Sequence, residues 1–149
     1  MSASGTLPTR FIQLLEELLR DGQSVRFRAP GWSMHPTIRD CEVITVAPLG
    51  ASLVREGDVV LYRTGGAAIA HRVTRVRSAA GRSEGLVLRG DAAHCCDRPI
   101  GVAQVLGRVL AVERDGRTVR LDRPSPGWVR ALGRVVRDAR SKVAALMRA

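Results

Sequence analysis

Short runs of β-forming residues recur at regular spacing through the middle of the chain, and this spacing constrains the fold more than any other feature. Turns rich in Gly, Pro and Asp separate the runs, and Asp115-Gly116 is a strong hairpin signal. The runs are Glu42–Ala47, Asp58–Tyr62, Ala68–Arg77, Gly85–Arg89, Val105–Glu113 and Thr118–Leu121. The pattern predicts a mainly β, compact antiparallel body.

The residues before this body have helical spacing. Apolar side chains recur at three- and four-residue intervals over Leu7–Arg20, with Thr6 or Thr9 as capping candidates and Asp21-Gly22 as a stop signal. A short alternating run that begins at Val25 follows. We therefore expect an N-terminal amphipathic helix within residues 1–23 and a β-domain over residues 24–122.

The last residues are again helical in pattern and strongly basic. Residues 121–149 carry seven basic and two acidic side chains, while the whole chain has a net charge of +10. We expect a basic amphipathic helix over residues 123–149. It could cover the β-body, lie on an anionic membrane as a peripheral contact, or bind an acidic partner, and the sequence leaves these alternatives open.

Composition narrows the class of protein. The chain has 149 residues, 45% of them hydrophobic, which suits one domain with a real core. Aromatic residues make up only 3%, too few for the stacking platforms of single-stranded nucleic-acid binders, so no specific nucleic acid is expected as a partner.

The sequence also predicts a location. No run approaches the roughly 18 to 20 apolar residues of a membrane span, and Glu16-Glu17 interrupts the only signal-like stretch. Three cysteines, two of them adjacent, form no disulfide framework. We expect a soluble protein of the cytoplasm, in contact with a membrane at most peripherally.

A stiff loop, Gly31–Ile38, holds the most interesting serine, Ser33, between glycine and proline. Alone, Ser33 would be read as a turn residue, and His71 in a later run as a core histidine. Other polar motifs follow in order, however. They are Gly57-Asp58-Val59-Val60, His71-Arg72-Val73, Gly90-Asp91 and then Asp97.

Taken together, Ser33-Met34-His35-Pro36 and these downstream motifs resemble the signal peptidase I and SOS-repressor superfamily of serine peptidases. The resemblance covers roughly residues 24 to 112. It implies a compact antiparallel β-barrel fold with flanking N- and C-terminal helices, and a serine endopeptidase activity without cofactor. The membrane anchor that usually precedes the serine motif of signal peptidases is not expected in the charged N-terminal helix.

The general base can be assigned from the lysine count. Family members use either Lys or His, and the only lysine here is Lys142, near the end of the chain. His71 is therefore the expected base for Ser33, because a neutral imidazole with an ordinary pKa near ~6.5 suits neutral pH. A carboxylate should orient it. The resemblance favours Asp97, six residues after Asp91, and Asp91 is the alternative or holds the loop.

The resemblance also implies how substrate is bound. An extended peptide or protein segment with small residues before the cleaved bond would add to a strand edge, beside Gly31, Met34 and Pro36. The Ser33 N–H is the expected oxyanion donor. Some relatives carry a second, hydroxyl donor where this chain has Gly31. A leader or precursor peptide is the expected substrate, and a catalytically weak or inactive peptide-binding or regulatory module is the alternative.

The remaining histidines and cysteines do not have metal-ligand spacing, so no metal site is expected. His35 should line the cleft, and the three cysteines should be small buried or half-buried thiols. They are Cys41, Cys95 and Cys96. Ala79-Ala80-Gly81 is the most family-like internal cleavage sequence, although a flexible loop is the simpler reading.

Overall fold

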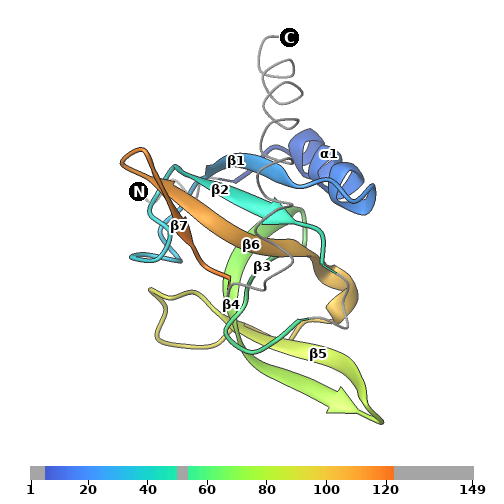
Figure 1. Ribbon diagram of the computed structural model, residues 1–149. Helices are drawn as coiled ribbons and strands as arrows, with labels where there is room; N and C mark the ends of the chain where they lie inside the picture. Colours follow the sequence, from blue (N-terminus) through green and yellow to red (C-terminus); the bar gives the residue numbers. More distant parts are fainter. Residues whose placement is uncertain (1–5, 50–53, 123–149) are drawn as a thin grey trace.

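The computed structural model describes residues 6–49 and 54–122, which form one helix and a seven-stranded antiparallel sheet (Figure 1). A single turn of 3-10 helix, η2 (Val102–Gln104), precedes the sixth strand. The other elements are α1 (Thr9–Arg20), β1 (Val25–Ala29), β2 (Glu42–Ala47), β3 (Val59–Thr64), β4 (Ala67–Ala79), β5 (Arg82–Arg89), β6 (Val105–Arg114) and β7 (Arg117–Arg120).

The sheet order is β1-β2-β6-β3-β4-β5, and β7 also pairs with β6. All pairs are antiparallel, which confirms the predicted mainly β, antiparallel fold with an N-terminal helix. The path is open among the described residues, with β1 and β5 at its two ends, so these strands do not close into the barrel that the resemblance implied. Strand β6 joins the halves: it lies between β2 and β3, and its last residues pair with β7.

Strand β3 is buried on both sides because its residues alternate between two apolar clusters. Val59 and Leu61 belong to a cluster that also contains residues of α1, β1 and β2. Val60 and Tyr62 belong to a second cluster, formed with β4 and β5. A strand covered on both faces reads as a continuous apolar run rather than an alternating one.

Helix α1 packs its apolar stripe on the first cluster. Ile12, Leu15 and Leu19 are buried, at the helical spacing seen in the sequence. Pro8 occupies the N-cap position and no side chain caps the helix, so neither Thr6 nor Thr9 is the cap. Proline serves here because its fixed φ of −58° suits the entry to the helix.

The β4–β5 hairpin extends away from α1 (Figure 1) and closes with a two-residue turn. Ala80 and Gly81, with φ of 50° and 74°, form this turn, and Ala79 pairs with Arg82. The flexible loop expected over these residues is therefore wrong: the segment is a tight hairpin turn, in which positive φ at both positions matches the strand twist.

The cysteine prediction is also wrong, because Cys41, Cys95 and Cys96 are all exposed. Cys41 lies in a turn with φ of 61°, and the other two lie in the irregular segment after β5, so none faces a core. Among residues 6–49 and 54–122, no helix is long and apolar enough to cross a membrane. The basic helix expected over residues 123–149 lies outside the described residues, and the three-part division of the chain stays a prediction.

Candidate active site

Ser33 lies in the loop that leaves β1. Gly31 begins it with φ of 110°, a conformation that side-chain-bearing residues rarely adopt, and its N–H donates to the Asp40 carboxylate at 2.7 Å. The loop then turns twice, with the His35 N–H donating to the Trp32 carbonyl and the Ile38 N–H to the Met34 carbonyl. A hydroxyl-bearing residue at position 31 would strain this backbone, which explains the glycine.

An apolar groove of about 510 Å³ runs beside the loop. Gly31, Ser33 and buried Met34 line it on one side, and Ala67–His71 of β4 line it on the other. Phe27 and Ala29 of β1 form part of its wall. The structure thus brings Ser33 and His71 to the same groove.

Two neighbours of Ser33 lie differently from expectation. His35 is exposed, and its ring packs 5.8 Å from that of Trp32 instead of lining the groove. Pro36, expected to contact substrate, is not among the groove-lining residues that the structure describes; its carbonyl accepts a hydrogen bond from Arg114. Trp32, at the groove rim, is 64% exposed.

The His71 imidazole of β4 pairs with Asp97, which comes from the irregular segment after β5. Its Nδ1 forms a short hydrogen bond with Asp97 Oδ2. The Asp97 N–H donates to the Leu88 carbonyl at 2.7 Å, so the end of β5 fixes the segment that supplies this carboxylate. The Tyr62 hydroxyl of β3 donates to Asp97 Oδ2 at 3.3 Å and lies 3.4 Å from His71 Nδ1.

The other ring nitrogen of His71 is buried and has no hydrogen-bond partner among the described residues. An unpaired buried polar atom is costly, and such atoms call for an explanation. Gly90 packs closely against this nitrogen because it has no side chain. A Cβ on Gly90 would lie 2.5 Å from the Ser33 carbonyl oxygen and 3.1 Å from His71 Nε2. The Ser33 backbone and the free nitrogen therefore approach the same point.

The turn after β5 also holds the serine loop. The Ala92 N–H donates to the Ser33 carbonyl at 3.0 Å, and the Ala93 N–H donates to the Gly90 carbonyl at 2.9 Å. Since Ser33 points its carbonyl to this turn, residues 90–93 connect the serine loop to the strand that precedes Asp97.

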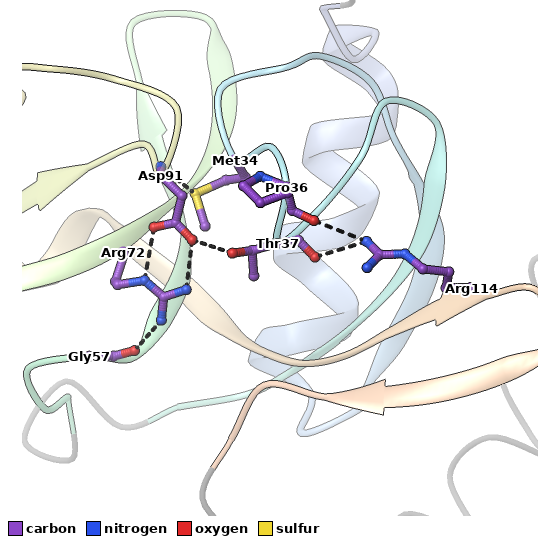
Figure 2. Close-up of polar contacts among 7 residues, drawn as sticks. All are labelled: Met34, Pro36, Thr37, Gly57, Arg72, Asp91 and Arg114. Atoms are coloured by element: carbon purple, nitrogen blue, oxygen red, sulfur yellow. Dashed lines mark hydrogen bonds and ion pairs between the residues drawn. The ribbon is translucent and has the colours of Figure 1, made fainter.

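Asp91 makes different contacts from Asp97. Both of its carboxylate oxygens face the Arg72 guanidinium (Figure 2). The two hydrogen bonds from Arg72 measure 2.9 and 2.7 Å, and one oxygen also accepts from Thr37 Oγ1 at 2.5 Å. Its N–H also faces Met34 Sδ at 3.4 Å. The contacts bind the serine loop to β4, next to His71, while the His71 ring is bound by Asp97.

Electrostatics in this cluster favour a charged Asp91. Burial alone would raise the pKa of the Asp91 carboxyl, but hydrogen bonds from Arg72 and Thr37, with the positive charges of Arg72 and Arg89, outweigh it and lower that pKa. The hydrogen bond with Asp91 raises the pKa of Arg72. Both partners therefore keep their charges at neutral pH.

Arg114 of β6 fixes the far end of the serine loop (Figure 2). Its Nη2 donates to the carbonyls of Pro36 and Thr37, each at 3.2 Å. The same guanidinium forms a bidentate pair with Glu42 at 2.6 and 2.7 Å, and this hydrogen bonding lowers the pKa of Glu42. Both charged pairs, Arg72–Asp91 and Arg114–Glu42, thus hold the serine loop at Thr37.

Sequence reasoning missed Tyr62 and Arg114. A lone tyrosine in an apolar strand does carry a signal, because a buried phenolic hydroxyl usually finds a polar partner. Arg114 gives no such signal in the sequence, because nothing distinguishes it from the many other arginines of the chain. Asp58, from the Gly57-Asp58 motif, accepts from the Arg55 N–H at 2.9 Å in its own turn. No cluster of three or more His, Cys, Asp or Glu side chains that could hold a metal occurs in the described part of the chain.

Comparison with known proteins gives one family match. Residues 2–110 match the family model described as Peptidase S24-like, which spans Ser33, His71, Asp91 and Asp97. No curated protein matches the chain.

Proposed function

The chain belongs to the Peptidase S24-like family, and from this premise we propose that it is a serine endopeptidase. Ser33 is the nucleophile, His71 the general base and Asp97 the carboxylate that orients the base. One observation carries the proposal: His71 holds Asp97 through Nδ1, while Nε2 stays buried, unpartnered and beside the Ser33 backbone at a shared groove.

The chemistry follows from this arrangement. His71 carries its proton on Nδ1, where Asp97 accepts it, so Nε2 is free to take the Ser33 hydroxyl proton as the oxygen attacks a peptide carbonyl. The imidazolium then gives that proton to the leaving amine, and the C–N bond breaks to leave an ester on Ser33. Water, deprotonated by His71, attacks the ester and releases the carboxylic acid with the free serine.

The negative charge that develops on the reacting carbonyl oxygen needs hydrogen-bond donors to stabilise it. The Ser33 N–H is the proposed first donor, and position 31 supplies no side-chain donor because it is glycine. Losing one donor of an oxyanion hole costs on the order of 10² to 10³ in rate. We therefore expect slow turnover.

The groove offers two unpaired strand edges to a substrate. Strand β1 pairs only with β2, and β4 pairs with β5 only from Arg72 onward, so Ala67–His71 have one free edge among the described residues. Val73 donates to the Asp58 carbonyl on the β3 side. Because main-chain groups alternate along a strand, those of Ala68 and Ala70 point to the free edge.

An extended peptide can therefore add as a strand beside Ser33, with main-chain hydrogen bonds supplying affinity. Met34, Phe27 and Leu61 crowd the apolar wall, which suits small residues before the cleaved bond. The proposed substrate is a leader or precursor peptide that is extended and accessible.

A library of extended peptides with alanine at alternating positions tests the proposal, with products identified by mass spectrometry. Wild type should cleave a subset after small residues, and Ser33→Ala should lose at least about 10³-fold in rate. His71→Ala should fall to a similar level, while Asp91→Asn, if folded, should keep the larger part of the activity. Hydrolysis by Ser33→Ala at the wild-type rate contradicts the assignment.

A catalytically weak peptide-binding module of the same fold is the second candidate, favoured by the glycine at position 31, which supplies no side-chain donor to an oxyanion. It predicts that peptides of the library bind with equal affinity to wild type and Ser33→Ala, with no product after prolonged incubation. Ser33-dependent product formation excludes it.

A further inference from the structure

Tyr62 is a buried, titratable group that the mechanism above leaves unused. Its side chain is only 3% exposed and packs in the second apolar cluster with Val60 and Val73. In the β3–β4 register Tyr62 lies opposite Ile69, so His71 is its diagonal neighbour on the same face of the sheet. The two rings have centroids 6.0 Å apart.

The hydroxyl of Tyr62 contacts both members of the His71–Asp97 pair. It lies 3.3 Å from Asp97 Oδ2 and 3.4 Å from His71 Nδ1. A carboxylate can only accept, and Nδ1 carries the proton that it donates to Asp97. The single proton of the Tyr62 hydroxyl is therefore directed to Asp97 Oδ2, which accepts from the tyrosine and the imidazole together.

We propose that Tyr62 is a positioning residue of the catalytic site, which fixes Asp97 Oδ2 against His71 Nδ1 and moderates the basicity of the imidazole. This inference rests on the proposed function. Asp97 comes from an irregular segment, its side chain is 31% exposed, and its main-chain bond to Leu88 does not itself orient the carboxylate. The tyrosine, held in a strand, adds a second restraint on the carboxylate to the one that His71 supplies.

A donor on the carboxylate also spreads its negative charge. With that donor in place, Asp97 attracts the proton on His71 Nδ1 less strongly. Burial, together with the charge and hydrogen bond of Asp97, raises the pKa of Tyr62, so the hydroxyl keeps its proton throughout the working range.

Charged side chains also come from the elements packed against His71. Arg72, the next residue of β4, is bound to Asp91, on which the positive charge of Arg89 at the end of β5 also acts, and Arg98 follows Asp97 in the chain. Within the described residues, the titratable groups that contact the imidazole are Asp97, from the segment after β5, and Tyr62, from β3.

Tyr62→Phe tests the inference because it removes the hydroxyl and keeps the ring that packs in the apolar cluster. The titration of the His71 ring nitrogens is followed by NMR, and hydrolysis of a peptide cleaved by wild type is followed against pH. The variant should shift the His71 titration midpoint and the acidic limb of kcat/KM upward by about half a pH unit. kcat should fall about tenfold with KM nearly unchanged.

Thr74→Val is the matched control, since it removes a hydroxyl of β4 whose hydrogen bonds go to neither His71 nor Asp97: it donates to the Val87 carbonyl at 3.0 Å and lies 3.9 Å from Cys96 Sγ. It should leave both pH curves unchanged. Identical His71 titrations in wild type and Tyr62→Phe overturn this inference whatever the activity. A shifted titration in a protein without Ser33-dependent hydrolysis overturns the proposed function and leaves the Tyr62–Asp97–His71 coupling standing.

Discussion

At the residue scale, Gly90 determines whether the serine loop and the base can approach each other. Its position admits no Cβ, because the atom would lie 2.5 Å from the Ser33 carbonyl oxygen. The motif Gly90-Asp91 was visible in the sequence, but the reason for the glycine was not, since it depends on a contact between residues 57 positions apart.

Gly90→Ala should therefore push the serine loop away from His71. We expect a loss of peptide hydrolysis of at least about tenfold and a destabilisation of about 1–3 kcal/mol. Gly85→Ala, in the same strand region, is the control, because its Cβ would lie 3.5 Å from the Ile100 carbonyl, an ordinary contact. Equal hydrolysis rates and unfolding midpoints for the two variants would show that the close approach at Gly90 is unimportant.

The sequence alone could not assign separate roles to the two aspartates, Asp91 and Asp97. Sequence spacing and the lysine count identified Ser33 and His71 as candidates, and both lie at the groove. Asp91 and Asp97 could be ranked only by resemblance, because both follow β5 closely. The distinction depends on which cation or imidazole each carboxylate meets, and that is set by strand pairing far along the chain.

At the element scale, strand β4 is the central feature, because its first half pairs with β3 alone and leaves one edge free within the described residues. Its first residues border the groove and the rest pairs with β5. The sequence placed β2 correctly and found the other strands within a few residues. It could not give the order β1-β2-β6-β3-β4-β5, because the insertion of β6 between β2 and β3 rests on long-range pairs without a local signal.

Ala70→Leu should fill the groove where a small substrate side chain is expected. The added side chain should raise KM for cleaved peptides at least about tenfold, because a misfit of even one methylene group in a pocket is worth about 1–3 kcal/mol. Ala103→Leu, in the exposed turn η2, adds the same volume away from this groove. If KM responds equally in both variants, or in neither, the groove is not the substrate site.

The link between the serine loop and β4 is expected to be acid-sensitive. The pKa of Asp91 is lowered in the folded protein, so its contribution to stability is present above the unfolded value near ~3.9 and is lost as pH falls through the lower folded value. Asp91→Asn lacks that contribution. Urea unfolding should show wild type more stable by about 1–2 kcal/mol at pH 7, and the difference should shrink below pH 4. A difference that is constant with pH would mean that Asp91 contributes through shape alone.

At the scale of the whole molecule, many arginines of the β-body form ion pairs with carboxylates. Arginines of five strands pair with carboxylates, among them Arg26 with Glu113 and Arg63 with Glu16. The sequence predicted that half of the net charge lies in residues 121–149. Net charge alone cannot distinguish paired from unpaired arginines, so the internal pairing emerged only from the structure.

Global stability should depend on the junction of α1 with the sheet. Leu15 is 1% exposed in the cluster that also lines the groove, so Leu15→Ala should lower the free energy of unfolding by about 2–4 kcal/mol. Gln13→Ala, on the exposed side of the same helix, should change it by less than about 0.5 kcal/mol. Equal urea midpoints for both variants would contradict the packing described for α1.

The most direct test of the central claim is labelling by a serine-directed phosphonate probe, followed against pH by intact-mass and peptide mass spectrometry. We expect a single adduct on Ser33, a labelling rate that rises as His71 loses its proton, no adduct in Ser33→Ala, and strongly slowed labelling in His71→Ala with the fold retained. An adduct elsewhere, no adduct on folded wild type, or labelling of His71→Ala at the wild-type rate would contradict a Ser33–His71 catalytic pair.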